Sequence, residues 1–95
     1  MANKPPNKSQ AKKTFVVEGK ECTIYEPDFK QLSFGLSALN DATIGDLALA
    51  GKAVFDVCMV ECDKEIKEDA KMLMSICIEI AKEYLLPYEV KIKKN

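Results

Sequence analysis

Apolar residues between Thr43 and Leu86 recur at the spacing of helix faces, and this pattern is the strongest structural signal in the chain. In the second half of the stretch they follow one another at alternating intervals of four and three residues, at Ile66, Ala70, Leu73, Cys77, Ile80 and Tyr84. That spacing is typical of one face of an α-helix. The pattern predicts helices over 43–60 and 66–86, joined by a short acidic link. Leu73, at the centre of the apolar face, is expected to be buried.

Strand and turn signals on either side of these helices predict a small sheet. β-Branched and aromatic residues flank Gly19, which predicts a β-hairpin over 14–25 with a connection of three or four residues. A first helix is expected near 28–40, directly after a proline. Residues 88–93 alternate apolar and charged side chains, as a half-buried strand does. The predicted fold class is therefore α+β, with an N-terminal β-hairpin, three amphipathic helices and a C-terminal strand completing a small antiparallel sheet.

Charge is distributed unevenly along the 95 residues. Residues 1–13 carry lysines, two prolines and no acid, so they are expected to form a flexible basic tail, followed by a single α+β domain over 14–95. The segment 14–90 holds all fifteen acids and seven lysines, a net charge of −8, while 91–95 is again basic. An acidic body repels a phosphate backbone, and the chain has no arginine for bidentate recognition of guanine. The pattern argues against specific nucleic-acid binding, although lysine-rich ends that contact nucleic acid remain an alternative.

The cysteines admit a metal, a redox and a structural interpretation. The four residues are Cys22, Cys58, Cys62 and Cys77, none in a C-x-x-C pair, and no histidine is available to complete a mixed zinc site. Cys58 and Cys62 stand four residues apart, which suits a helix face. We expect all four to be reduced, metal-free and mostly buried, since the N-terminus has no secretory signal. A redox enzyme that uses Cys58 and Cys62 is the alternative.

Catalytic chemistry is not indicated anywhere in the chain. Without histidine there is no histidine base and no Ser-His-Asp triad. The scattered glycines form no phosphate-cradling loop, and the acids between Asp63 and Asp69 lack the spacing of a calcium loop. We therefore expect a protein that is not an enzyme and needs no cofactor. No uncharged run is long enough to span a membrane, and a cytoplasmic location is expected.

The apolar arc of the last helix is wider than a surface helix of a monomer usually needs, which favours a shared surface. The partner-binding candidates lie beside the apolar stripes of the last two helices, at Leu47, Val54, Met72, Ile76 and Ile80. We expect them to mediate self-association or binding to another protein. The alternative is that the hairpin and the first helix cover all of them in a monomer.

Several segments resemble the tail assembly chaperones of long-tailed bacteriophages, particularly those of phages and prophages of Bacteroides-like hosts. The likeness lies in the hairpin 13–24, in 49–58, in the turn 62–69 and in the last helix with its lysine-rich end. Two features depart from the family pattern, namely Cys62, where glycine is frequent, and the proline-containing tail.

The resemblance implies a largely helical, often oligomeric protein that binds the tape measure protein and keeps it soluble until tail tube subunits polymerise around it. A broad apolar helix face is compatible with that role, because it can cover apolar stripes of a helical partner. The alternative is a small non-enzymatic adaptor or oligomerisation domain of another phage or bacterial system.

Overall fold

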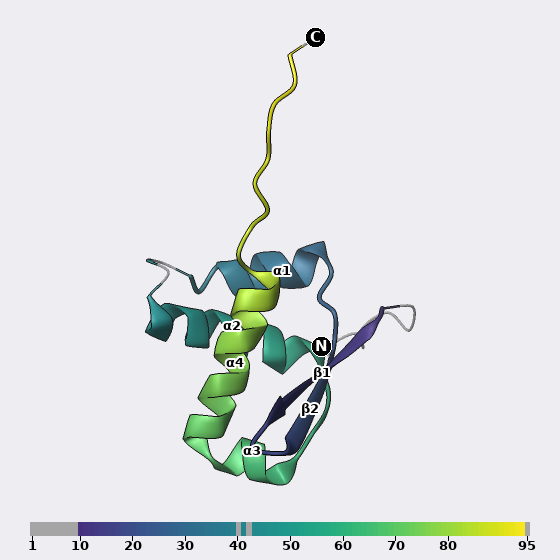
Figure 1. Cartoon of the computed structure of the whole chain (residues 1–95), viewed down its shortest axis with the longest axis vertical. Helices are drawn as coiled ribbons and strands as arrows, with labels where there is room; N and C mark the ends of the chain where they lie inside the picture. The colour runs from purple at the N-terminus through teal and green to yellow at the C-terminus, as the bar shows by residue number, and fades with distance from the viewer. Residues whose placement is uncertain (1–9, 40, 42, 95) are drawn as a thin grey trace, which may run out of the picture.

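The computed structural model describes residues 10–39, 41 and 43–94, and within them the chain is α+β with three antiparallel strands and four helices (Figure 1). The sheet order is β1-β2-β3. In chain order the elements are β1 (Lys12–Val17), β2 (Lys20–Tyr25), α1 (Phe29–Leu36), α2 (Ile44–Cys58), β3 (Met59–Cys62), α3 (Lys64–Glu68) and α4 (Ala70–Tyr84). The predicted fold class is confirmed, whereas the predicted number of helices and the origin of the third strand are wrong.

The N-terminal hairpin forms where the sequence predicts it, but with a tighter turn. Val17 pairs with Lys20, so only Glu18 and Gly19 connect the strands, and both have positive φ, at 50° and 75°. This geometry matches the right-handed twist of the strands, which explains why a two-residue turn replaces the expected longer one. β1 begins at Lys12, so the boundary predicted at residue 13 falls inside a strand. Residues 1–9 of the predicted basic tail lie outside the described residues.

The third strand of the sheet is β3, and the prediction that 88–93 completes the sheet is wrong. β3 pairs with β2 through Cys22 opposite Cys62 and Thr23 opposite Glu61, with a bulge between Thr23 and Ile24. Residues 85–94 belong to no strand of the described chain. Because β2 is flanked by β1 on one side and β3 on the other, it offers no position to the C-terminal segment. Because β3 begins at Met59, the helix predicted over 43–60 ends at Cys58, and Cys62 lies on a strand and not on a helix face with Cys58.

Side-chain caps decide where the helices begin. Asp28 accepts a hydrogen bond from the Gln31 backbone and Gln31 reaches back to Asp28, a reciprocal cap that starts α1. Thr43 caps α2 by accepting from the backbone N–H of Asp46 at 3.1 Å. Asp69 takes extended backbone geometry and accepts from two N–H groups of the following turn, so it ends α3 and begins α4. This cap divides the single helix predicted over 66–86 into two.

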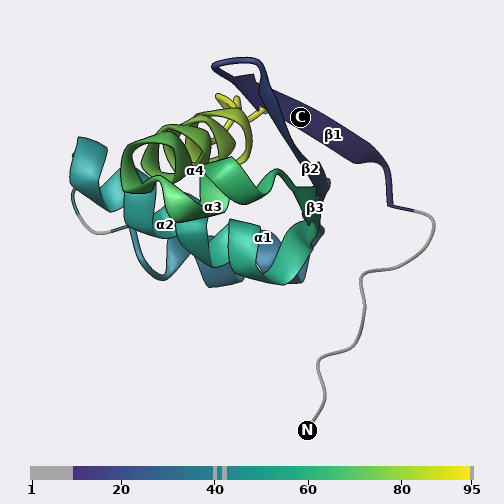
Figure 2. The ribbon, with the colours of Figure 1, turned by 90° about the horizontal axis from the view of Figure 1, so that it is seen from below.

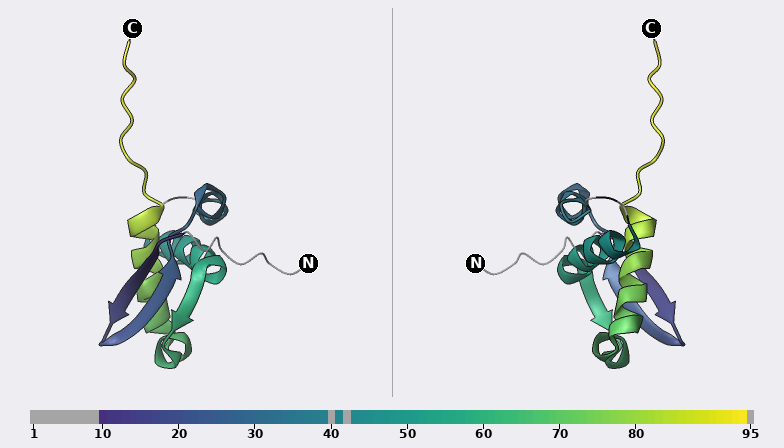
Figure 3. Two further views of the ribbon diagram at one scale, coloured as in Figure 1. Left: turned by 90° about the vertical axis from the view of Figure 1, so that its right-hand side faces the viewer. Right: turned by 90° about the vertical axis from the view of Figure 1, so that its left-hand side faces the viewer.

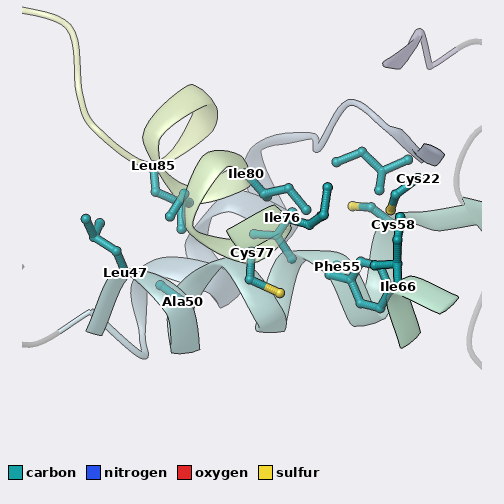
Figure 4. Packing of buried hydrophobic residues seen from close by; sticks show 13 residues of the cluster. Cys22, Leu47, Ala50, Phe55, Cys58, Ile66, Ile76, Cys77, Ile80 and Leu85 are labelled. Atoms are coloured by element: carbon teal, nitrogen blue, oxygen red, sulfur yellow. The ribbon is translucent and has the colours of Figure 1, made fainter. Parts of the chain in front are cut away.

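The core lies where α2, α4 and β2 meet. Helices α2 and α4 cross on one side of the sheet, and α1 covers one end of the pair (Figures 2 and 3). Leu47 and Leu85 lie at one end of the core, and Cys22, Cys58 and Ile66 lie at the other (Figure 4). The buried side chains are Cys22, Ile24, Leu47, Ala50, Val54, Phe55, Cys58, Ile66, Ile76, Cys77, Ile80, Ala81 and Leu85.

Candidate partner-binding surface

Four of the five partner-binding candidates lie inside the domain. Leu47, Val54, Ile76 and Ile80 all belong to the core, and none exposes more than 8% of its surface. The broad apolar arc of α4 has an intramolecular explanation, because one side of this helix contacts β1 and the other contacts α2. In the described chain these four residues therefore do not form an outer contact surface. They are covered chiefly where α2 and α4 pack together, whereas the alternative interpretation of the sequence has the hairpin and the first helix cover all five.

Met72 is the exception among the candidates. It is half-buried on the first turns of α4 and packs against the edge of the core. It also lines a hollow of about 270 Å³ between the hairpin turn and α4, together with Val17, Glu18, Asp69, Lys71 and Ser75. The Ser75 hydroxyl in this lining donates a hydrogen bond to the Lys71 backbone oxygen at 2.8 Å.

The larger exposed apolar surface lies on α1 and the first half of α2. The exposed side chains there are Phe29, Phe34, Leu36, Ile44 and Leu49. By helical spacing Phe29 and Leu36 share one face of α1 and Phe34 lies off it. That off-face aromatic residue is the signal of this surface in the sequence.

A second exposed apolar set lies on the C-terminal segment. Tyr88, Val90 and Ile92 are 83–93% exposed, and the segment extends away from the helices and the sheet (Figure 1). Leu85, just before it, is 3% exposed and packs beside Gly35 of α1. The segment is thus anchored at its start and unpaired over its alternating stretch.

Ion pairs and one polar cluster join the start of the hairpin to the end of α4. Lys13 donates to Glu83 at 2.6 Å, and this hydrogen bond raises the pKa of Lys13 above its usual value. The Tyr84 ring packs edge-on against Phe15, with its hydroxyl 3.2 Å from a Glu26 oxygen. Burial, with the neighbouring Glu26 carboxylate, raises the pKa of Tyr84 well above its ordinary value. These contacts fix the end of α4 beside the first residues of β1.

All four cysteines are free thiols, and three are buried. Burial, with a smaller effect from the neighbouring Cys62 thiol, raises the pKa of Cys22 to about 12. Burial raises the pKa of both Cys58 and Cys77 to about 11. A thiol with a raised pKa is protonated near neutral pH and is therefore a poor nucleophile. The buried thiols behave as small apolar side chains, and only Cys62 reaches solvent.

We expect Cys62 to react with iodoacetamide well before the other three cysteines in mildly alkaline buffer, because it alone is partly exposed. Mass spectrometry should find one alkylated thiol in the native chain and complete alkylation after unfolding in guanidinium. The Cys62→Ser variant serves as the control and should lose the fast reaction. A second thiol that reacts equally fast would contradict the buried positions of Cys22, Cys58 and Cys77.

Acidic side chains line a second hollow, beside the hairpin turn. This hollow of about 450 Å³ is lined by Gly19, Glu21, Glu61, Cys62 and Asp63. Even so, residues 10–39, 41 and 43–94 contain no group of three or more potential ligands placed to hold a metal ion. Among the same residues, no helix combines the length and apolar character needed to cross a bilayer.

Comparisons of this chain with protein-family models, with curated proteins and with solved structures find no significant match.

Proposed function

We propose that this chain is a tail assembly chaperone, a cytoplasmic, non-enzymatic protein that binds the helical tape measure protein and keeps it soluble. The observation that carries the proposal is the set of large apolar side chains exposed on α1 and α2, namely Phe29, Phe34, Leu36, Ile44 and Leu49. The resemblance supplies the identity of the client, and the surface supplies the means of binding it.

The α1–α2 surface suits a helical client for two reasons. Aromatic and large aliphatic side chains on neighbouring helices supply the apolar contact area that an amphipathic helix buries when it docks. Each fully buried large apolar side chain contributes about 1.5–3 kcal/mol to such a contact, so a few of these residues are enough for specific binding. The net charge of −8 over residues 14–90 would keep the complex dispersed.

Co-expression with the tape measure protein tests the proposal. The wild-type chain should raise the soluble fraction of that protein and be captured with it. The double variant Phe34→Glu/Leu49→Glu should lose most of this capture, since a charge at a desolvated contact is costly. Both positions are exposed, so the melting temperature of the variant should stay close to that of the wild type.

The matched control is Lys67→Glu, which changes the net charge by the same two units at an exposed position of α3, away from α1 (Figure 1). It should leave capture unchanged. A wild-type chain that neither binds nor solubilises the tape measure protein would remove the chaperone function and leave the small adaptor as the working hypothesis. Loss of capture with Lys67→Glu as well would show that the effect is general electrostatics and not contact at the apolar surface.

A further inference from the structure

We propose that residues 88–93 of one chain add as a strand to the free edge of β1 in a second copy of the same chain. The inference is independent of the client in the proposed function. It joins two unpaired features of the described structure, an alternating extended segment and an open sheet edge. The segment and β1 each have six residues, so their lengths match.

The edge of β1 is open because, among residues 10–39, 41 and 43–94, no strand lies beyond it in the sheet order. In an antiparallel pair only alternate residues bond to the partner strand. Glu26 donates its backbone N–H to Ala11 O at 2.7 Å, so the alternate set that includes Lys13, Phe15 and Val17 bonds to β2. The backbone N–H and C=O groups of Lys12, Thr14 and Val16 therefore point outward, where an incoming strand can pair with them.

The side chains of β1 also alternate, between the core face and the solvent face of the sheet. Phe15 and Val17 pack against the core, whereas Val16 is 63% exposed on the opposite face. The incoming segment has the matching division, with Tyr88, Val90 and Ile92 on one side and charged residues on the other. When the segment is added with its apolar side chains on the Phe15 face, these side chains lie next to Phe15 and Val17, where α4 continues the core. Its charged side chains then point to solvent.

Charge selects a parallel orientation. β1 begins with Lys12 and is followed at its other end by Glu18, while Asp69 lies across the hollow beside that end. The segment has Glu89 near its start and lysines at its end. Parallel addition with the apolar residues on the Phe15 face pairs 88–93 with 13–18, so Lys93 lies opposite Glu18 and Glu89 lies opposite Thr14, diagonal to Lys12. Antiparallel addition on the same face pairs the segment with 12–17 and brings Lys93 opposite Lys12. Opposite charges across neighbouring strands stabilise pairing and like charges oppose it.

The edge of β3 is a poorer acceptor than that of β1. It has four residues and carries the bulge opposite Thr23 and Ile24, a feature that disrupts edge pairing. The donor segment also does not occupy the β1 edge of its own chain. Leu85 is held beside α1, and from there the segment leads away from the sheet (Figure 3). The occupant we assign to the β1 edge is therefore the segment of another copy.

Light scattering of the purified full chain at sub-millimolar concentration tests the proposal. The wild type should show a mass at least twice the 10.6 kDa of one chain. Val90→Pro removes an N–H from the centre of the donor segment and should give monomers without lowering the melting temperature, since Val90 is exposed in the single chain. Lys94→Pro, just beyond the segment, is the matched control and should associate like the wild type.

A mixing experiment distinguishes strand addition from other interfaces. Val16→Pro removes an outward N–H of β1, and Val16→Lys places a further lysine there as a milder substitution in case proline disturbs the hairpin. Each edge variant should be monomeric alone and should form a one-to-one mixed species with Val90→Pro, because the edge variant keeps an intact donor segment and Val90→Pro keeps an intact β1 edge. A monomeric wild-type chain would overturn the proposal. Protection of 88–93 from hydrogen exchange in such a monomer would show that the segment pairs within its own chain. Association that survives both Val90→Pro and Val16→Lys would also overturn it.

Discussion

Gly51→Ala should destabilise the protein severely or prevent it from folding. A Cβ at this position would lie 1.7 Å from the carbonyl oxygen and 2.5 Å from the carbonyl carbon of Cys77. These are backbone atoms of α4, so no side-chain rotation can relieve the overlap, and α2 and α4 would have to separate along their contact. We expect a cost of about 3 kcal/mol or more. Thermal unfolding followed by circular dichroism should show a melting temperature about 12 °C lower or no cooperative transition.

Two other glycines of the same fold provide controls. Gly45→Ala adds a Cβ whose nearest neighbour is the Thr43 hydroxyl at 3.9 Å, so it should stabilise α2 by up to about 1 kcal/mol through helix propensity. Gly35→Ala meets a Val54 methyl at 2.6 Å, which can shift partly, and should fall between the two. A melting temperature for Gly51→Ala equal to that for Gly45→Ala would show that the α2–α4 approach is looser than described.

Ile80→Asp should unfold the protein at ordinary temperature. Ile80 is completely buried on α4, and no buried polar or charged residue is recorded among the described residues with which a carboxylate could pair. Burial of an unpaired charge costs several kcal/mol, and we expect about 4 kcal/mol or more, a large part of the stability of a small domain. Denaturant titration measures this directly, with Ile80→Val as the conservative control at about 1 kcal/mol.

Leu73→Asp should be the milder change, although the helical pattern alone places Leu73 at the centre of the apolar face. Leu73 is only partly buried and packs against the margin of the core, so a carboxylate there can stay hydrated. We expect about 1–2 kcal/mol, because little apolar area is lost and no charge is enclosed. An effect equal to that of Ile80→Asp would show that the face centred on Leu73 is the true interior.

Local structure was largely predictable from the sequence because its causes are local. The alternation and the Glu18-Gly19 turn predict the hairpin, and Thr43 predicts the start of α2. Helix boundaries were less predictable where one side chain could either lie inside a helix or cap the start of a new one. Asp69 fits the first turn of a continuous helix, yet it caps a new one, and nothing in the spacing of apolar residues distinguishes these cases.

The identity of the third strand and the division between core and surface were decided by the tertiary structure. Residues 88–93 have the clearer strand pattern, yet β3 pairs with β2 because the end of α2 delivers Met59 directly to that edge. Periodicity shows which residues share a helix face, but not what the face packs against. The crossing of α2 and α4 buries Val54, Ile76 and Ile80 and leaves Phe34 and Leu49 exposed. The sequence by itself therefore determined the fold class and most elements, while the packing of those elements determined which apolar residues remain available to a partner.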